Sequence, residues 1–430
     1  MRNSTAAGAP AGRSPQPSRN PLRRLLAVLG PGLMMAGAAI GVSHLVQSTR
    51  AGADYGFTLM WVILLANVLK YPFFEYGHRF TAATGQNLLE GYLRQGRWVL
   101  GLFFALNLVT AVTSIAGVTF VTAALAENLF GFGFSNAVWS AGLLLFCVAL
   151  TVLGHYRYVE GAIKAMLAVL FFATVSATLA AAIKGPVAAP GTPVPALSIA
   201  FLVALLGWMP APIEVSVWNS LWVQAKERAL GRRISLAEAR WDFNLGYVLT
   251  ILLALIFTAL GALVMFGSGE SLSGNASVFS KQLVQLYGAT LGELWMPVVA
   301  AAAFSAMLST VLTVVEAYPR SLAEALHLLA PGLRIRHHAH HSLWMVGTSL
   351  LGWLIVQAFL DDLTRLIDLV TSIAFLSAPV FAVMNYRLIF SDQVGAEARP
   401  GLALRLLSWA GILFLAGFSL FFLYSRYFAA

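Results

Sequence analysis

A short polar segment interrupts the first long apolar run of this chain. Gly41 is followed by Val42, Ser43 and His44, and the residues on both sides are small or apolar. A hydroxyl and an imidazole can exchange hydrogen bonds with a solute, and an imidazole also binds metal ions of intermediate softness. If this run crosses a membrane, its backbone can leave the helical hydrogen-bond pattern only where protein groups or a cavity replace the lost partners. The segment therefore predicts a broken helix with a substrate site at Gly41, Ser43 and His44.

A second interruption occurs in the sixth long apolar run, where residues 207–212 read Gly-Trp-Met-Pro-Ala-Pro. Pro210 and Pro212 lack a backbone N–H and clash with the preceding turn, so a helix must unwind or kink near Met209. Paired breaks in corresponding positions of two halves are the sequence sign of an inverted repeat with its substrate site between the breaks. Met209 is accordingly a further candidate substrate ligand.

Other ionisable residues lie inside the predicted spans, and such residues are functional candidates by default. Lys70 is near the middle of the second span, and Glu214 follows the interruption of the sixth. Glu75, His78 and Arg79 are spaced to share one helical face. Two interpretations are open. The five residues belong to the transport pathway or to coupling, or they are structural. In the structural case Lys70 pairs with Glu75 or Glu214, and the three residues on one face form an ion cluster.

Motifs for catalysis or cofactor binding are weak or missing. The tract His337–His341 has the composition of a metal-binding segment, but it follows two arginines between predicted spans, and we expect a solvated polar loop. With Cys147 as the single cysteine there is no disulfide framework. The chain contains no Gly-x-x-x-x-Gly-Lys-Ser/Thr nucleotide loop and no Ser/His/Asp set. We therefore expect a protein that is not an enzyme and has no cofactor.

The elements that must position these residues are membrane spans. Of the 430 residues, 59% are hydrophobic and 10% are charged, with a mean hydropathy of +0.78, whereas soluble domains carry about 25% charged residues. Roughly 20 apolar residues cross a bilayer. Such runs occupy residues 25–50, 56–84, 99–129, 136–154, 160–184, 196–225, 243–267, 288–317, 342–360, 366–389 and 404–425. The sequence therefore predicts an all-α polytopic membrane protein with about eleven transmembrane helices surrounded by lipid bilayer.

The charge distribution predicts the orientation of these spans. The net charge of +9 and the pI of 9.8 come from basic residues gathered in every second loop, which is the pattern of cytoplasmic loops and needs no nucleic-acid partner. We expect an integral protein of a prokaryotic inner (plasma) membrane, with the N-terminus in the cytoplasm and the C-terminus outside. Residues 1–20, rich in Ser, Pro, Gly and Asn, are predicted to be a disordered cytoplasmic tail.

The chain resembles the Nramp family of metal-ion transporters, which have the LeuT-type inverted-repeat fold. The resemblance rests on residues 30–32 (Gly-Pro-Gly), 51–56 (Ala-Gly-Ala-Asp-Tyr-Gly) and 59–67 (Leu-Met-Trp-Val-Ile-Leu-Leu-Ala-Asn). Shorter matches continue it at Arg79, Thr84, Gly85, Glu90, Tyr158, Glu160, Met209, Pro210, Ser309, Thr310 and Pro379. It implies a first five-helix repeat at 21–184, a second at 185–389 and an additional eleventh helix within 390–430, with helices 1 and 6 broken.

The sequence departs from the family pattern at the expected ligands. The first break of the family reads Asp-Pro-Gly-Asn, and residues 41–44 here read Gly-Val-Ser-His. Ala211 stands where the family has a histidine after Met-Pro, and Ser377 stands where it has a glutamine before the proline of span 10. The resemblance thus adds Ala211 and Ser377 to the predicted substrate site, which contains no carboxylate.

The leading hypothesis is a secondary transporter that works by alternating access on a small inorganic ion. Without an anionic ligand the site would bind Mn or Fe ions poorly, whereas positive helix ends and side-chain donors favour a small inorganic anion such as bicarbonate. A divalent metal transporter with His44 and Met209 as metal ligands is the alternative. A membrane sensor or scaffold that does not transport is the second alternative. A proton or sodium ion is the expected coupling ion.

Overall fold

The computed structural model describes residues 25, 28–153, 156–332 and 337–428. The tail predicted for residues 1–20 lies outside the described residues. The regular elements in the described ranges are helices. In chain order they are α2 (Pro31–Ala39), η1 (Ser43–Ser48), α3 (Thr49–Tyr55), α4 (Met60–Thr84), α5 (Leu88–Gln95), α6 (Arg97–Phe130), α7 (Asn136–Val152), α8 (Tyr156–Lys184), α9 (Ile199–Gly207), α10 (Val215–Leu230), α11 (Leu236–Val264), α12 (Ala276–Leu291), η2 (Glu293–Trp295), α13 (Met296–Leu329), α14 (His337–Ala358), α15 (Leu363–Ile389), η3 (Ala396–Ala398) and α16 (Leu402–Tyr427).

The predicted apolar runs coincide with these helices. The first run covers α2, η1 and the start of α3, and the sixth covers α9 and most of α10. The run 288–317 covers the end of α12, η2 and much of α13, and each of the other runs overlaps one helix. The chain is thus an integral membrane protein made of helices, with its first and sixth spans broken, as the sequence predicts. Two short helices, α5 and α12, lie outside the runs predicted as spans for most of their length.

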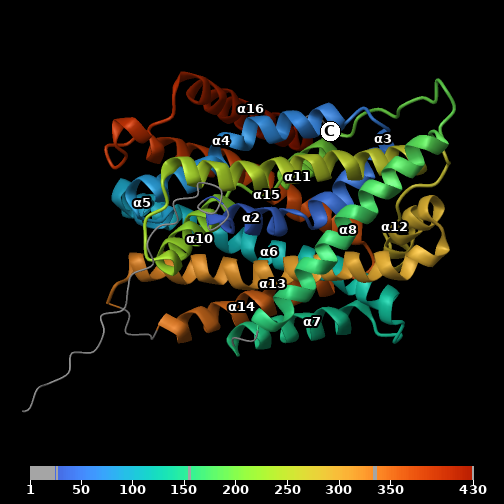
Figure 1. The fold of residues 1–430 in the computed structure, drawn as a ribbon, viewed down its shortest axis with the longest axis horizontal. Helices are drawn as coiled ribbons and strands as arrows, with labels where there is room; N and C mark the ends of the chain where they lie inside the picture. Colours follow the sequence, from blue (N-terminus) through green and yellow to red (C-terminus); the bar gives the residue numbers. More distant parts are fainter. Residues whose placement is uncertain (1–24, 26–27, 154–155, 333–336, 429–430) are drawn as a thin grey trace, which may run out of the picture.

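Most of the long helices lie roughly along one axis of the molecule, and α8 crosses them obliquely (Figure 1). In that view α16 and α4 lie at one edge, α7 and α14 lie at the other, and each of these pairs is in contact. The half-helix α2 packs on α11 and α13, and α9 packs on α15 and α4. Both broken spans are therefore enclosed by unbroken helices, which positions the breaks inside the protein and away from lipid.

Five of the described helices are long and apolar enough to cross a membrane by length and composition alone. They are α6, α11, α13 together with η2, α15 and α16. The helix α4 has 25 residues but carries Lys70, Glu75 and Arg79, so its composition is less apolar. These three side chains are buried, because the neighbouring helices rather than lipid surround them.

Local sequence signals account for several helix ends. Gly85 ends α4 in the left-handed conformation with φ of 80°, which a residue without Cβ adopts readily. The next helix, α5, begins with a capping box. In it the Glu90 amide donates to Asn87 Oδ1 at 3.1 Å and the Asn87 amide donates to Glu90 Oε2 at 2.7 Å. These signals fix the short turn between α4 and α5.

Close backbone contact between α2 and α11 requires glycine at residue 32. A Cβ added to Gly32 would lie 2.0 Å from the carbonyl oxygen of Asp242 in α11. The Gly32 amide also donates to Asp242 Oδ2 at 2.7 Å, and the Gly30 amide donates to Oδ1 at 3.1 Å. The first half of the broken span is thereby attached to α11 through its free N-terminal amides.

Substituting Gly32→Ala should therefore lower the stability of the folded protein. The added methyl forces α2 and α11 apart, and overpacking of this kind typically costs about 1–3 kcal/mol. Thermal unfolding of the purified protein in detergent measures the loss. Gly37→Ala in the same helix is the matched control, because a Cβ there meets no atom within 4 Å. Equal unfolding temperatures for both variants would contradict this packing.

Candidate substrate-binding site

The first span breaks between α2, which ends at Ala39, and the π-helical segment η1, which begins at Ser43. The Ser43 hydroxyl lies 2.6 Å from the carbonyl oxygen of Ala39 and 2.7 Å from Nδ1 of His44. The other ring nitrogen of His44 lies 2.9 Å from the carbonyl oxygen of Thr250 in α11. His44 is fully buried, and both of its ring nitrogens contact protein groups.

The sixth span breaks between α9, which ends at Gly207, and α10, which begins at Val215. In a continuous helix the Leu206 carbonyl would accept a hydrogen bond from residue 210, but Pro210 has no N–H to donate. The Nζ atom of Lys70 in α4 lies 2.6 Å from the Leu206 oxygen and 2.9 Å from the Gly207 oxygen. A side chain from another helix thus satisfies the carbonyls that the break frees.

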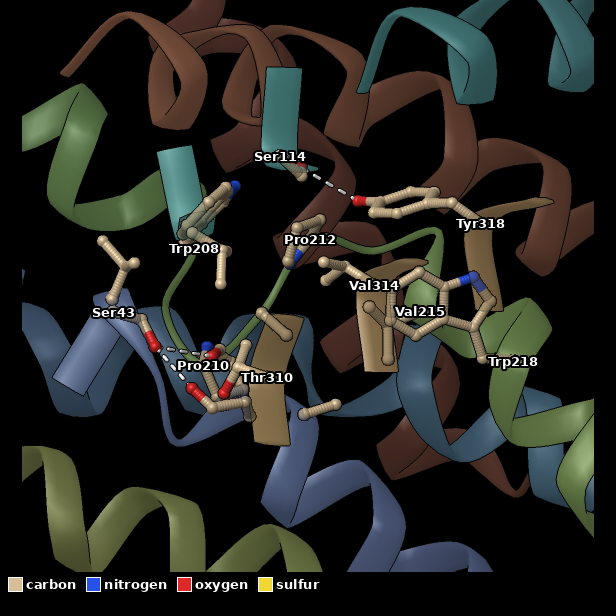
Figure 2. Close-up of a pocket in the computed structure, with 15 residues that line it drawn as sticks. Ser43, Ser114, Trp208, Pro210, Pro212, Val215, Trp218, Thr310, Val314 and Tyr318 are labelled. Atoms are coloured by element: carbon tan, nitrogen blue, oxygen red, sulfur yellow. Dashed lines mark hydrogen bonds between the residues drawn. The ribbon is translucent and has the colours of Figure 1, made fainter. Parts of the chain in front are cut away.

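A small cavity lies between the two breaks (Figure 2). The cavity has a volume of about 30 Å³, which is room for a few water molecules or one small ion. Its walls come from both broken spans, α6 and α13. The lining residues are Ala38, Ala39, Val42, Ser43, Ser114, Val118, Trp208, Pro210, Ala211, Pro212, Val215, Trp218, Thr310, Val314 and Tyr318.

The polar atoms on this lining include hydrogen-bond donors without acceptors. The indole N–H groups of Trp208 and Trp218 are buried and have no hydrogen-bond partner within the described part of the chain. The Tyr318 hydroxyl donates to Glu214 Oε1 at 3.2 Å and lies 3.1 Å from the Ser114 hydroxyl. Figure 2 shows Ser114 between Trp208 and Tyr318. The cavity wall therefore carries hydroxyls and two indole rings whose N–H groups have no partner among the described residues.

The structure brings two of the six predicted substrate residues into the cavity lining, namely Ser43 and Ala211. His44 packs against α11, as described above. Ser377 Oγ donates to the Ala374 carbonyl within its own helix at 3.0 Å.

The other two predicted substrate residues, Gly41 and Met209, are buried and are not part of the lining. A Cβ on Gly41 would lie 2.9 Å from the Thr310 side chain, so glycine at this position permits the close contact between the first break and α13.

The five predicted pathway residues lie outside the cavity lining and in two separate groups. Lys70 is bonded to the carbonyls of α9, and Glu214 accepts from Tyr318, which lines the cavity. Glu75 and Arg79 form a buried ion pair, with Arg79 Nη2 and Glu75 Oε1 2.6 Å apart.

The second group has contacts beyond that pair. Arg79 Nη1 also donates to the Ala398 carbonyl at 2.9 Å. His78 Nε2 lies 3.9 Å from Asp242 Oδ2, which is too far for a hydrogen bond. Glu75, His78 and Arg79 therefore connect α4 with the segment before α16 and with the α11 region, rather than with the cavity.

The prediction that His337–His341 is a solvated loop is wrong. These residues form the first turns of α14. His340 is buried, and a ring nitrogen of His341 lies 3.2 Å from the Glu316 carbonyl oxygen. Among the described residues, no group of three or more His, Cys, Asp or Glu side chains is placed to hold a metal ion. The helix α14, which begins with this tract, packs against α13.

Sequence reasoning missed the residues that supply most of the polar lining. Ser114 and Tyr318 are isolated polar residues in apolar helices, and Trp208 and Trp218 read as packing residues. A polar residue in an apolar span is a visible signal, but it does not reveal which face of the helix it occupies. Trp208 had the better signal, since it directly precedes the Met-Pro pair of the break.

Removing the carboxylate of the buried pair should destabilise the protein. In Glu75→Gln the Arg79 guanidinium, 5% exposed, loses its counter-charge, and breaking such a pair costs about 3–5 kcal/mol. The unfolding temperature in detergent is expected to fall well below that of the control Glu293→Gln, an exposed carboxylate. If both variants unfold at the wild-type temperature, the ion pair does not stabilise the fold.

Several solved structures resemble this fold at low sequence identity. A variant of the manganese transporter of Eremococcus coleocola aligns with a TM-score of 0.73 and 15% identity, covering 96% of this chain and 89% of that chain. The nucleobase-cation-symport-1 family transporter Mhp1, in a closed conformation, aligns with a TM-score of 0.55 and 14% identity, covering 93% of both chains. These likenesses concern the fold alone.

Sequence comparison identifies the family. An uncharacterised protein of Pasteurella multocida is 36% identical over 404 residues, or 92% of each chain. The divalent metal cation transporter MntH of Bacillus subtilis is 28% identical over 252 residues, or 56% of each chain. The profile of the Natural resistance-associated macrophage protein-like family, Nramp, matches residues 32–425. The broken spans, the helical membrane fold and this match together establish that the chain belongs to the Nramp family of membrane transporters.

Proposed function

We propose that this protein is a secondary transporter of a small inorganic anion, which it holds in the cavity between the two broken spans. Bicarbonate is a candidate of suitable size and charge. The observation that carries the proposal is the pair of buried indole N–H groups on the cavity wall, Trp208 and Trp218, which have no acceptor within the described residues. The broken spans on either side of the cavity supply the elements that would move in alternating access.

The chemistry of the lining supports an acceptor-bearing substrate. None of the residues that line the cavity is Asp, Glu, His, Cys or Met. A divalent cation in the bilayer interior needs carboxylate, carbonyl, imidazole or sulfur ligands. The lining instead presents the hydroxyls of Ser43, Ser114, Thr310 and Tyr318, together with the two indoles. A hydroxyl can donate or accept a hydrogen bond and can therefore contact an anion or a cation, whereas an indole N–H can only donate.

The energetic cost of the unpaired donors favours a ligand that carries hydrogen-bond acceptors. A buried donor without a partner costs about 1–3 kcal/mol, and a ligand that accepts from it recovers that energy on binding. An oxyanion has several acceptor atoms, so one ion can accept from more than one donor of the lining.

Divalent metal transport is the second candidate, and the names of relatives favour it. Residues of this chain align with a manganese transporter and with the divalent metal cation transporters named MntH. In this reading His44 and Met209 would be the metal ligands. They would have to rotate toward the cavity, since His44 contacts Thr250 and Met209 is not part of the lining. His44→Ala and Met209→Ala should then weaken manganese uptake.

Removing the indole N–H groups should weaken anion transport. Trp208→Phe and Trp218→Phe keep an aromatic ring but lose the donor, so the apparent affinity for the anion should fall about 5- to 10-fold in each variant. Uptake of labelled bicarbonate or another small anion into proteoliposomes, measured against concentration, gives this value. Trp344→Phe is the matched control, because its indole N–H is also buried and has no partner among the described residues, but lies outside the cavity. Unchanged affinity in both cavity variants would contradict the proposed site.

A screen of ions decides between the candidate functions. Proteoliposomes are supplied in turn with labelled bicarbonate, other small anions, and divalent cations such as Mn²⁺. The proposal expects saturable anion uptake and no divalent uptake. Manganese uptake without anion uptake would establish the second candidate. Absence of flux for every ion would instead favour a membrane sensor or scaffold built on the same fold.

A further inference from the structure

We propose that the Lys70 side chain is a built-in cation that fills a monovalent cation site at the break of the sixth span. Its Nζ atom occupies the place where the carbonyl oxygens of Leu206 and Gly207 converge, at 2.6 and 2.9 Å. Carbonyls freed at the C-terminal end of a half-helix are typical ligands of coupling cations in transporters with broken helices. In this chain a tethered ammonium holds that place permanently.

The position of Lys70 makes it difficult to exchange for solvent. Its side chain is 1% exposed, and it comes from the middle of α4, which packs against α9. A water molecule or free ion therefore has no open route to the carbonyls while Lys70 is present. Because Pro210 lacks the N–H that would satisfy Leu206, the carbonyls need a donor or cation from outside their own helix.

Charges at both ends of the break match the partial charges of the half-helices. Lys70 lies at the C-terminal end of α9, where the helix dipole is negative. Glu214 lies at the N-cap of α10, where the dipole is positive, and its Oε2 atom is buried and has no hydrogen-bond partner among the described residues. Glu214 also attracts Lys70 electrostatically. The break is thus neutralised by the chain itself and needs no bound cation.

Truncating Lys70 should uncover the site. Lys70→Ala leaves the two carbonyl oxygens facing an empty volume, and oxygen ligands of this kind hold small hard cations. The variant should therefore be stabilised by sodium or ammonium ions relative to choline at equal ionic strength. We expect its unfolding temperature to rise by about 3 °C or more, because a ligand that binds only the folded state stabilises it.

Two variants separate cation binding from general effects of salt. Lys70→Met fills most of the same volume without a charge or donor, so it should show no selective response to sodium or ammonium. Lys184→Ala removes another lysine that caps a carbonyl, since Lys184 Nζ lies 2.9 Å from the Ala289 oxygen, but in an exposed position where water replaces it. This control should respond to the cations no more than the wild type does.

The wild-type protein provides a test that does not depend on the folding of any variant. With Lys70 in place, sodium, potassium and ammonium should stabilise it no better than choline. A selective stabilisation of the wild type by one small cation would overturn the proposal, and so would a folded Lys70→Ala protein that is indifferent to cations. A Lys70→Ala protein that survives purification only in sodium or ammonium buffer would support it. The readout is thermal stability, so the result stands apart from whether anions are transported.

Discussion

The fold depends on one constraint: backbone groups inside a membrane must have hydrogen-bond partners, even where a helix stops. Both central spans stop in the interior, and the chain supplies the missing partners from side chains. Ser43 serves the Ala39 carbonyl at the first break, and Lys70 serves Leu206 and Gly207 at the second. The helix α4, which packs beside the second break, places Lys70 on the free carbonyls. A lysine is buried in the middle of α4 because these carbonyls need a donor.

The side chains that bond the free backbone carbonyls also determine which kind of ion the cavity attracts. At the second break Lys70 lies at the negative end of α9 and Glu214 lies at the positive end of α10. The remaining unmatched groups on the cavity wall are the indole donors of Trp208 and Trp218. A transporter whose relatives are named for divalent metal transport thereby presents a small pocket with hydroxyl and N–H character. The proposed selectivity for anions follows because Lys70 and Glu214 lie at the helix ends, whereas the cavity wall carries donors without partners among the described residues.

The architecture could be predicted from the sequence more completely than the substrate site. Apolar runs predict helices because each run must cross a bilayer, and Gly41, Pro210 and Pro212 predict the breaks through backbone chemistry that acts locally. The direction of a side chain depends on how its helix is rotated against its neighbours. His44 therefore turned out to face Thr250 rather than the cavity, and Tyr318 faced inward. Only Ser43 and Ala211 of the predicted substrate residues lie on the cavity wall.

Anomalous X-ray scattering tests directly whether the space between the breaks accepts an anion, with crystals soaked in bromide in one experiment and in Mn²⁺ in another. If it does, a bromide peak lies within hydrogen-bond distance of the Trp208 indole nitrogen, and no manganese peak lies between the broken spans. A manganese peak there, ligated by His44 and Met209 and without bromide in its place, would show that the site is a metal site instead.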